Sequence, residues 1–246
     1  MIHIIGGLAR GTGKTTIAVN LAVDRAEKNK RVVIVDCEPD QSAFNWSKLR
    51  SHGDHKIGSI LQGTPPIDVV CASGDITLIL KGLNRVYDIV IVDVGARDIK
   101  AFASAMRVAD NLYTPIYLSK VYSEMLLGEL KKMILEIKNP RMRCFAFANR
   151  PVFIGEAWNK ELVQTGEVVF QYNVFTLDWP LMEHEAIRQS IGSGLGVNEI
   201  YNDDSDWVVS DWLGAHDELE VLANHVFGDE PFMRPKYHNP PAEFVW

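Results

Sequence analysis

The chain has 246 residues, of which 47% are hydrophobic and 23% are charged, which is enough for one large α/β domain with a substantial buried core. Its formal charge of −7 argues against a protein that is basic over its whole surface, although it leaves local basic patches open. No apolar stretch reaches the ~18 residues of a membrane span, so we expect a soluble protein without membrane insertion. Cys37, Cys71 and Cys144 lie in or beside apolar runs, as reduced core thiols typically do, so we expect a cytoplasmic protein.

The first predicted elements are a short apolar strand, Ile2–Ile5, and a helix, Thr16–Lys28. Glycines in the loop between them permit the positive φ angles of a phosphate-binding nest, Lys14 supplies a cation for the β and γ phosphates, and the Thr15 hydroxyl can ligate Mg²⁺. One feature departs from the general pattern G-x-x-x-x-G-K-[ST], because Leu8 occupies the position of its first glycine. The predicted binding residues for a nucleoside triphosphate are Gly11, Thr12, Gly13, Lys14, Thr15 and Thr16.

Further along the chain, short runs rich in Val and Ile alternate with stretches of helical periodicity. The remaining predicted strands are Val32–Asp36, Ile67–Cys71, Asp88–Asp93, Leu112–Leu118, Cys144–Asn149 and Asn173–Leu177. The remaining predicted helices are Gln41–Arg50, Ile99–Val108, Ser123–Ile137, Met182–Ile191 and Asp217–Phe227. This alternation predicts an α/β fold with a doubly wound, mostly parallel sheet flanked by helices.

The domain is expected to span residues 1–228, and a proline-rich tail follows at 229–246. Prolines at 231, 235, 240 and 241 exclude a helix there, which leaves an arm on a partner or a disordered tail.

Acids and amides follow the predicted strands, where a doubly wound sheet binds its ligands. Asp36 and Glu38 come at the end of the second strand, Asp93 ends the fourth, and Asn149 ends the strand near residue 147. An aspartate after an Ile/Val run beside a phosphate loop typically holds a metal-bound water. The sequence therefore predicts Mg²⁺ between Thr15 and Asp93.

These residues resemble the deviant Walker-A ATPases, the family of ParA-type partition proteins and MinD, over residues 1–228. Ala9–Thr16 aligns with the family loop K-G-G-x-G-K-[ST]-T, Asp36–Asp40 with D-x-D-P-Q, and Val90–Asp93 with the Walker-B strand. The segment 45–48 is similar to the small ParF-type branch, which moves partition complexes and other cargoes. The resemblance implies a P-loop NTPase of the SIMIBI type.

The same resemblance implies a homodimer that encloses ATP and Mg²⁺ at its interface. In it, Lys14 and Thr15 would bind phosphates and Mg²⁺, Asp36 would support the metal shell, Glu38 would orient the attacking water, and Asn149 would read the adenine edge.

Several positions depart from the family, and two of them bear directly on hydrolysis. Ala9 stands where the signature lysine reaches across the dimer, so the cation has to come from Arg10, from Arg150, from another residue, or be absent. Glu38 replaces an aspartate and is one methylene longer; because a misplacement of about 1 Å can cost ~10²-fold in rate, we expect slow, partner-stimulated hydrolysis.

The resemblance further implies that the ATP-bound dimer binds nonspecific DNA, places the protein on the nucleoid, and is released by a small adaptor or centromere-binding partner. The cargo would be a plasmid, a chromosome or a protein-bound organelle such as the carboxysome. The charge distribution supports DNA binding in one segment and opposes it in another. Lys120–Arg150 carries a net charge of +4, whereas Leu195–Trp246 carries −9 and would repel phosphate. Two alternatives stay open: a nucleotide-gated interaction module with little hydrolysis, and a P-loop kinase or ligase acting on a small molecule.

Overall fold

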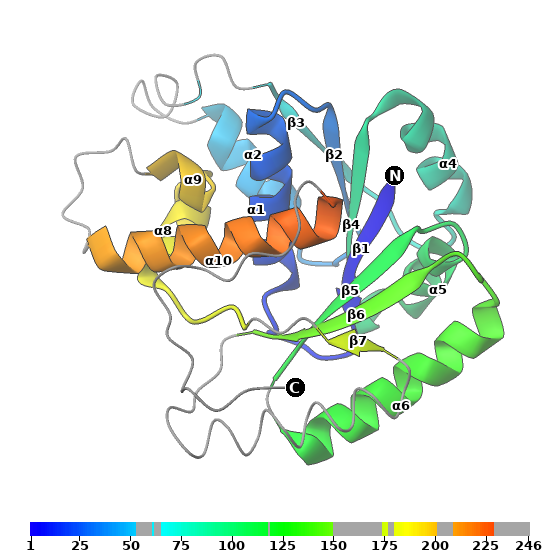
Figure 1. Ribbon diagram of the computed structural model, residues 1–246. Coiled ribbons are helices and arrows are strands. Elements are labelled where there is room, and N and C mark those ends of the chain that lie inside the picture. Colours follow the sequence, from blue (N-terminus) through cyan, green and yellow to red (C-terminus); the bar gives the residue numbers. More distant parts are fainter. Residues whose placement is uncertain are drawn as a thin grey trace.

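The computed structural model describes residues 1–52, 61, 65–117, 119–149, 174–176, 180–200 and 209–228. Seven strands in these segments form one sheet in the order β3-β2-β4-β1-β5-β6-β7, and every neighbouring pair is parallel. Helices cover both faces (Figure 1). The predicted α/β architecture is confirmed.

The strands lie close to their predicted ranges. They are β1 (Ile2–Gly7), β2 (Val32–Asp36), β3 (Ile67–Cys71), β4 (Ile89–Gly95), β5 (Asn111–Ile116), β6 (Arg143–Ala148) and β7 (Phe175–Thr176). The central strands are buried on both faces, as the continuous Val and Ile runs predict, because each face packs against helices. Cys71 is an exception to the predicted core thiols: it is exposed, since β3 is an edge strand.

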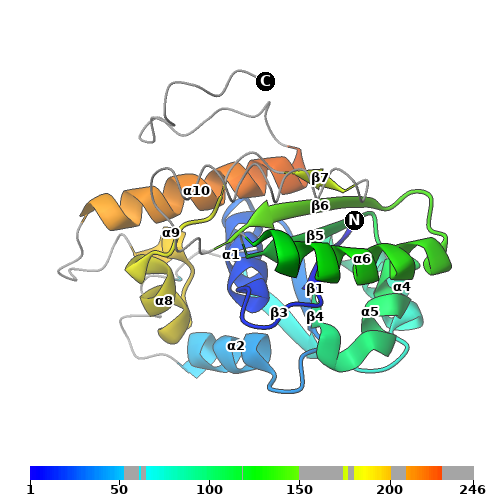
Figure 2. The same cartoon turned by 90° about the horizontal axis from the view of Figure 1, so that it is seen from below.

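The helices form two layers (Figures 1 and 2). One layer packs on the core that contains Ile5, Trp46 and Leu219, and consists of α1 (Lys14–Glu27), α2 (Ser42–His52), α8 (Glu185–Gly192), α9 (Val197–Ile200) and α10 (Val209–Phe227). The other packs on the core that contains Ile4, Leu80 and Phe102, and consists of α4 (Thr77–Val86), α5 (Ile99–Met106) and α6 (Lys120–Ile137). A short 3₁₀ turn, η1 (Ala96–Asp98), joins β4 to α5.

Several helices differ from the predictions. α6 begins three residues earlier than predicted, at Lys120, α8 begins three residues later, at Glu185, and α9 was not predicted. α1 begins two residues earlier, at Lys14, and α10 begins at Val209 instead of Asp217. α4 is absent from the predictions because its sequence opens on Thr77 and Ile79 and contains Gly82, all weak helix formers. It forms because Leu80 is fully buried against the sheet.

The strand register brings the predicted site residues together. β1 lies between β4 and β5, and Ile5 stands opposite Asp93, while Asp36 on β2 stands opposite Asp93 from the other side. The carboxyl ends of three neighbouring strands therefore converge at one edge of the sheet. The tail at 229–246 and Arg150 lie outside the described residues. None of the described helices is long and apolar enough to cross a membrane.

Candidate functional site

The loop between β1 and α1 has the backbone of a phosphate nest. Gly11 and Gly13 adopt φ angles of 68° and 79°, in the left-handed region that glycine accepts without a steric penalty. Gly13 is the residue that precedes α1, and it has no side chain with which to cap the amides of that helix. An anion at the N-terminus of α1 would accept hydrogen bonds from these amides and interact favourably with the helix dipole.

Lys14 is held over this loop. Its side chain is 8% exposed, and its Nζ atom donates a 2.8 Å hydrogen bond to the carbonyl oxygen of Ala9. The same atom lies 3.9 Å from Oε1 of Glu38. Gly95, the last residue of β4, lies against both side chains, because a Cβ atom there would meet Glu38 Oε1 and lie 3.0 Å from Lys14 Cε. Lys14, Glu38 and Gly95 therefore form one packed unit.

Asp93 has the properties of a metal-site carboxylate. It is fully buried, and neither of its oxygens accepts a hydrogen bond from the described residues. Burial raises its pKa to about 7, and the nearby Thr15 hydroxyl opposes this rise. A buried carboxylate beside a hydroxyl is a hard-oxygen donor set that fits Mg²⁺. The Thr12 hydroxyl is another buried group without a partner in the described part of the chain.

Asp36 has a role that the sequence did not indicate. One of its carboxylate oxygens accepts the backbone N–H of Glu38 at 3.0 Å, and the other accepts that of Phe44, also at 3.0 Å. Burial raises the pKa of Asp36, while these amides favour its charged form. It therefore fixes the turn that carries Glu38 toward Lys14, and Asp93 is the better-placed metal ligand.

The segment after β2 is also tied to the segment after β4. Asp40 forms an ion pair of 3.1 Å with Arg97 of η1. Burial raises the pKa of the Glu38 carboxyl, and the neighbouring Lys14 cation opposes this rise. The loops that follow β2 and β4 thus meet around the Lys14 ammonium group.

Asn149 touches the phosphate loop. Its Nδ2 atom donates a 2.6 Å hydrogen bond to the carbonyl oxygen of Thr12, and it is the atom that a side chain at Gly13 would meet. Besides the adenine-reading role that the resemblance implies, Asn149 therefore makes a contact that positions the phosphate loop.

Arg10 and Tyr117 lie at the outer side of the loop. The Tyr117 hydroxyl donates to the carbonyl oxygen of Arg10 at 3.3 Å, and Arg10 itself is exposed. Sequence reasoning missed both Tyr117 and Gly95. Their positions directly after β5 and at the end of β4 are the signal that would have found them.

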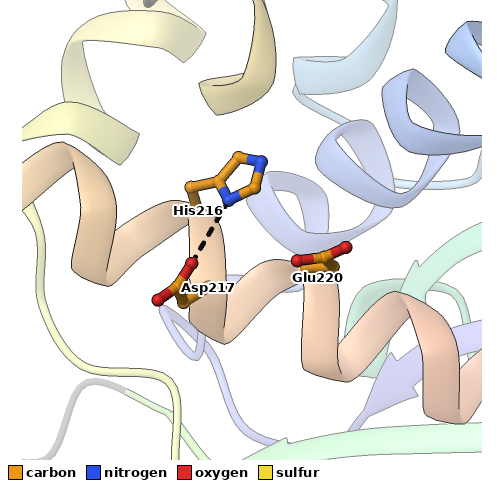
Figure 3. Close-up of side chains that lie close together, drawn as sticks. All are labelled: His216, Asp217 and Glu220. Atoms are coloured by element: carbon orange, nitrogen blue, oxygen red, sulfur yellow. Dashed lines mark hydrogen bonds and ion pairs between the residues drawn. The ribbon is translucent and has the colours of Figure 1, made fainter. Parts of the chain in front are cut away.

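One cluster of possible metal ligands lies elsewhere. In the described part of the chain, the ligand atoms of His216, Asp217 and Glu220 lie within 4.8 Å of one another, and the Nδ1 atom of His216 is 3.5 Å from Asp217 Oδ1 (Figure 3). All three project from α10, and Glu220 is exposed. They offer one nitrogen and two carboxylates on a helix surface, and we assign them no function.

Sequence comparison places the chain among known proteins. A family model described as the CobQ/CobB/MinD/ParA nucleotide binding domain matches residues 4–154, a range that contains most of β1, all of β2–β6 and the phosphate loop. Maintenance of carboxysome distribution protein A of Gloeobacter kilaueensis is 35% identical over 108 residues, which are 43% of this chain and 44% of that protein. The chromosome-partitioning ATPase Soj of Thermus thermophilus is 27% identical over 157 residues, 54% of this chain and 62% of that protein. The matched segments thus span less than two thirds of either relative.

Structural comparison agrees on the fold. An ATP complex of a McdA variant from Cyanothece has a TM-score of 0.66 with 15% identity, over 95% of this chain and 98% of that one. At this identity the likeness concerns the fold alone. The family match, in contrast, covers more than half of the chain and includes the strand that ends at Asp93. The chain belongs to the CobQ/CobB/MinD/ParA family of nucleotide-binding domains.

Proposed function

We propose that this protein is an ATP hydrolase that dimerises around ATP and Mg²⁺ and positions or segregates a cargo by ATP-dependent binding to nonspecific DNA. The observation that carries the proposal is the fully buried, unpartnered Asp93 carboxylate beside Thr15, at the end of the loop that carries Lys14. A buried carboxylate without a partner is costly unless a cation or proton occupies the site. The names of the relatives, which concern carboxysome distribution and chromosome partitioning, support the cargo part of the proposal.

Each residue of the site has a defined task in this proposal. The amides of Gly11–Thr16 and the Lys14 ammonium group bind the phosphates, and Thr15 with Asp93 holds the metal. Bound Mg²⁺ would neutralise charge on the phosphate oxygens. Asp36 fixes the turn, and Glu38 orients the attacking water once Lys14 is engaged by phosphate.

The cation that crosses the dimer interface has two candidates. Arg10 is exposed at the rim of the loop, and its guanidinium group suits a forked phosphate contact. Arg150 is the second candidate and lies outside the described residues. Arg10→Ala and Arg150→Ala separate them: loss of the trans-acting cation lowers turnover of the dimer and leaves the ATP affinity of the monomer nearly unchanged.

The nucleotide-gated module is kept as a second candidate because Glu38 is engaged by Lys14 instead of being free for catalysis. ATP turnover distinguishes the two, measured alone, with duplex DNA, and with candidate partner proteins. We expect slow turnover that rises with DNA and partner together, and ATP-dependent dimers in light scattering. Dimerisation without stimulated turnover would favour the interaction module. Normal ATP binding by Lys14→Ala, with Lys132→Ala as the surface control, would contradict the assignment of the loop.

A further inference from the structure

A pocket lies at the end of the sheet opposite the phosphate loop. It has a volume of about 510 Å³, and its lining includes Ile2, the first residue of β1, whereas the loop follows Gly7 at the other end of that strand. Six residues of strand separate the two sites by roughly 20 Å. The pocket volume falls in the range of small-molecule sites, roughly 300–1,000 Å³.

The walls of this pocket are strongly basic. Its polar lining comprises Lys81, Asn84, Arg85, Arg107, Asn139 and Arg141, and its one acid is Asp110. These side chains come from α4, from the end of α5 and from the turn between α6 and β6, which gather on the right of Figure 1. Four cations therefore face one acid in a chain whose overall charge is −7.

Little in the protein neutralises these cations. Lys81, Arg85 and Arg141 make no side-chain hydrogen bond or ion pair with the residues that the structure describes, and Arg107 pairs with the exposed Asp75 at 3.3 Å. Asp110 accepts the backbone N–H of Ile2 at 2.8 Å through one oxygen. Like charges around one cavity repel each other, and an anionic ligand relieves that repulsion.

The pocket is also preorganised. Asn139 donates from Nδ2 to the carbonyl oxygens of Met106 and Ala109, at 2.8 and 2.9 Å, and its Oδ1 accepts the backbone N–H of Arg141. The turn that carries Arg141 is thereby fixed to the end of α5, which carries Arg107. Ligand binding therefore loses less entropy, because the pocket walls are already ordered.

We propose that this basic pocket binds a small ligand with two phosphate groups. Each guanidinium group can bind two phosphate oxygens at once. The three arginines and one lysine outnumber the single carboxylate, and the resulting excess of positive charge suits a diphosphate or bisphosphate. Ile2, Val108 and Pro140 also line the pocket and offer apolar contact to an organic group. A small ligand fits better than a nucleic acid duplex because the cations converge on one cavity and do not follow an extended track.

The test is an NMR titration of the full-length protein with pyrophosphate, observed at the arginine Nε–Hε groups. Arg85, Arg107 and Arg141 are expected to shift together and to saturate at one equivalent. Arg10 reports separately on the phosphate loop, so binding at the pocket and at the loop are distinguished in the same spectrum, and the pocket does not depend on the proposed function.

Paired variants make the result specific. Arg85→Gln/Arg141→Gln removes two pocket charges, and the affinity followed at Arg107 should fall at least about tenfold. Lys100→Gln/Lys132→Gln removes two exposed charges from α5 and α6 outside the pocket and should stay within about twofold of the wild type. The proposal is overturned if the pocket arginines do not respond, or if the control loses as much affinity. It is equally overturned if a DNA duplex of about 20 base pairs shifts the same signals at lower concentration than pyrophosphate, which would assign the surface to nucleic acid.

Discussion

The ammonium group of Lys14 donates a 2.8 Å hydrogen bond to the carbonyl oxygen of Ala9, so the principal cation of the phosphate loop is bound by the loop itself. Glu38, at 3.9 Å, supplies the opposing charge. A phosphate group competes with Glu38 for this ammonium group, which has further N–H donors besides the one given to Ala9. Nucleotide binding is therefore coupled to the position of the turn that Asp36 fixes.

Glu38→Gln tests this coupling. The substitution removes the charge that competes with phosphate for Lys14, so we expect ATP affinity to rise about threefold and turnover to fall at least about tenfold. Nucleotide titration and phosphate release measure the two effects. Asp40→Asn, which alters the exposed pair with Arg97, is the control for charge alone. Unchanged affinity in Glu38→Gln would show that the Lys14 contact does not oppose binding.

Asn149→Ala separates two roles of one side chain. Because Nδ2 of Asn149 holds the carbonyl oxygen of Thr12, its loss should weaken the phosphate loop for every nucleoside triphosphate, by about three- to tenfold. Competitive titration with ATP and GTP measures this. A loss confined to ATP would instead support the adenine-reading role.

Gly95→Ala introduces a methyl group into the packed unit of Lys14 and Glu38. The new Cβ atom would displace the Glu38 carboxylate and the end of the Lys14 side chain. We therefore expect turnover to drop at least about tenfold, whereas stability should change by no more than about 1 kcal/mol because these flexible ends can shift. Gly82→Ala is the matched control. A Cβ atom there meets no described atom within 4 Å on α4, so turnover should be unchanged and stability should rise by about 0.5–1 kcal/mol.

A buried ion pair joins α2 to α9. Arg50 donates to both carboxylate oxygens of Glu199 at 2.7 Å, and Glu199 also accepts the backbone N–H of Gly196. Arg50→Met leaves a buried charge uncompensated and should lower the free energy of unfolding by about 3–5 kcal/mol.

Urea denaturation of this variant and of two others tests the argument. Adding Glu199→Gln to Arg50→Met should recover part of the loss, because it removes the unpaired charge. Arg188→Met, which breaks an exposed pair with Glu183, should cost about 0–1 kcal/mol. Equal losses in the two arginine variants would contradict the importance of burial.

His3 gives the protein a specific acid sensitivity. It is fully buried on β1, with its ring against Phe227 at 5.1 Å between centroids, and burial lowers its pKa to about 4. The unfolded chain takes up this proton near pH 6.5, so stability from neutral His3 is complete above pH 6.5 and is lost as the pH falls toward 4.

His3→Phe removes this titration. Between pH 7.5 and about pH 5, the wild type should lose about 2 kcal/mol more than the variant in urea unfolding. Between about pH 7.5 and 8.5 the difference between the two proteins should stay constant. Parallel pH profiles across the acid range would show that the pKa of His3 is the same in the folded and the unfolded chain.

Several strands were predictable because they are short, nearly continuous runs of Val and Ile that both helix layers bury, as in Val32–Asp36. The phosphate loop was predictable because Gly11, Gly13 and Lys14 are consecutive in the chain and act through backbone geometry. α4 was not, since its helix depends on the burial of Leu80 and not on local propensity.

Contacts between distant segments escaped the sequence for a different reason. The basic pocket combines Arg85, Arg107 and Arg141, which are 22 and 34 residues apart, so no window of the sequence contains it. Likewise, the local sequence does not distinguish Asp36 from Asp93. The Asp36 carboxylate caps a turn, whereas that of Asp93 has no partner among the described residues. Only the register of β2 and β4 and the path of the following loops separate their roles.

The position of β1 in the sheet has a consequence for biosynthesis. The first strand made is the central one, and its two neighbours, β4 and β5, end at Gly95 and Ile116. At about 5–20 residues per second, Ile2–Gly7 waits roughly 5–20 seconds for its second neighbour to be translated. During that interval an apolar strand has at least one edge open, so the nascent chain is most exposed to aggregation, and most dependent on chaperones, before the phosphate loop has a scaffold.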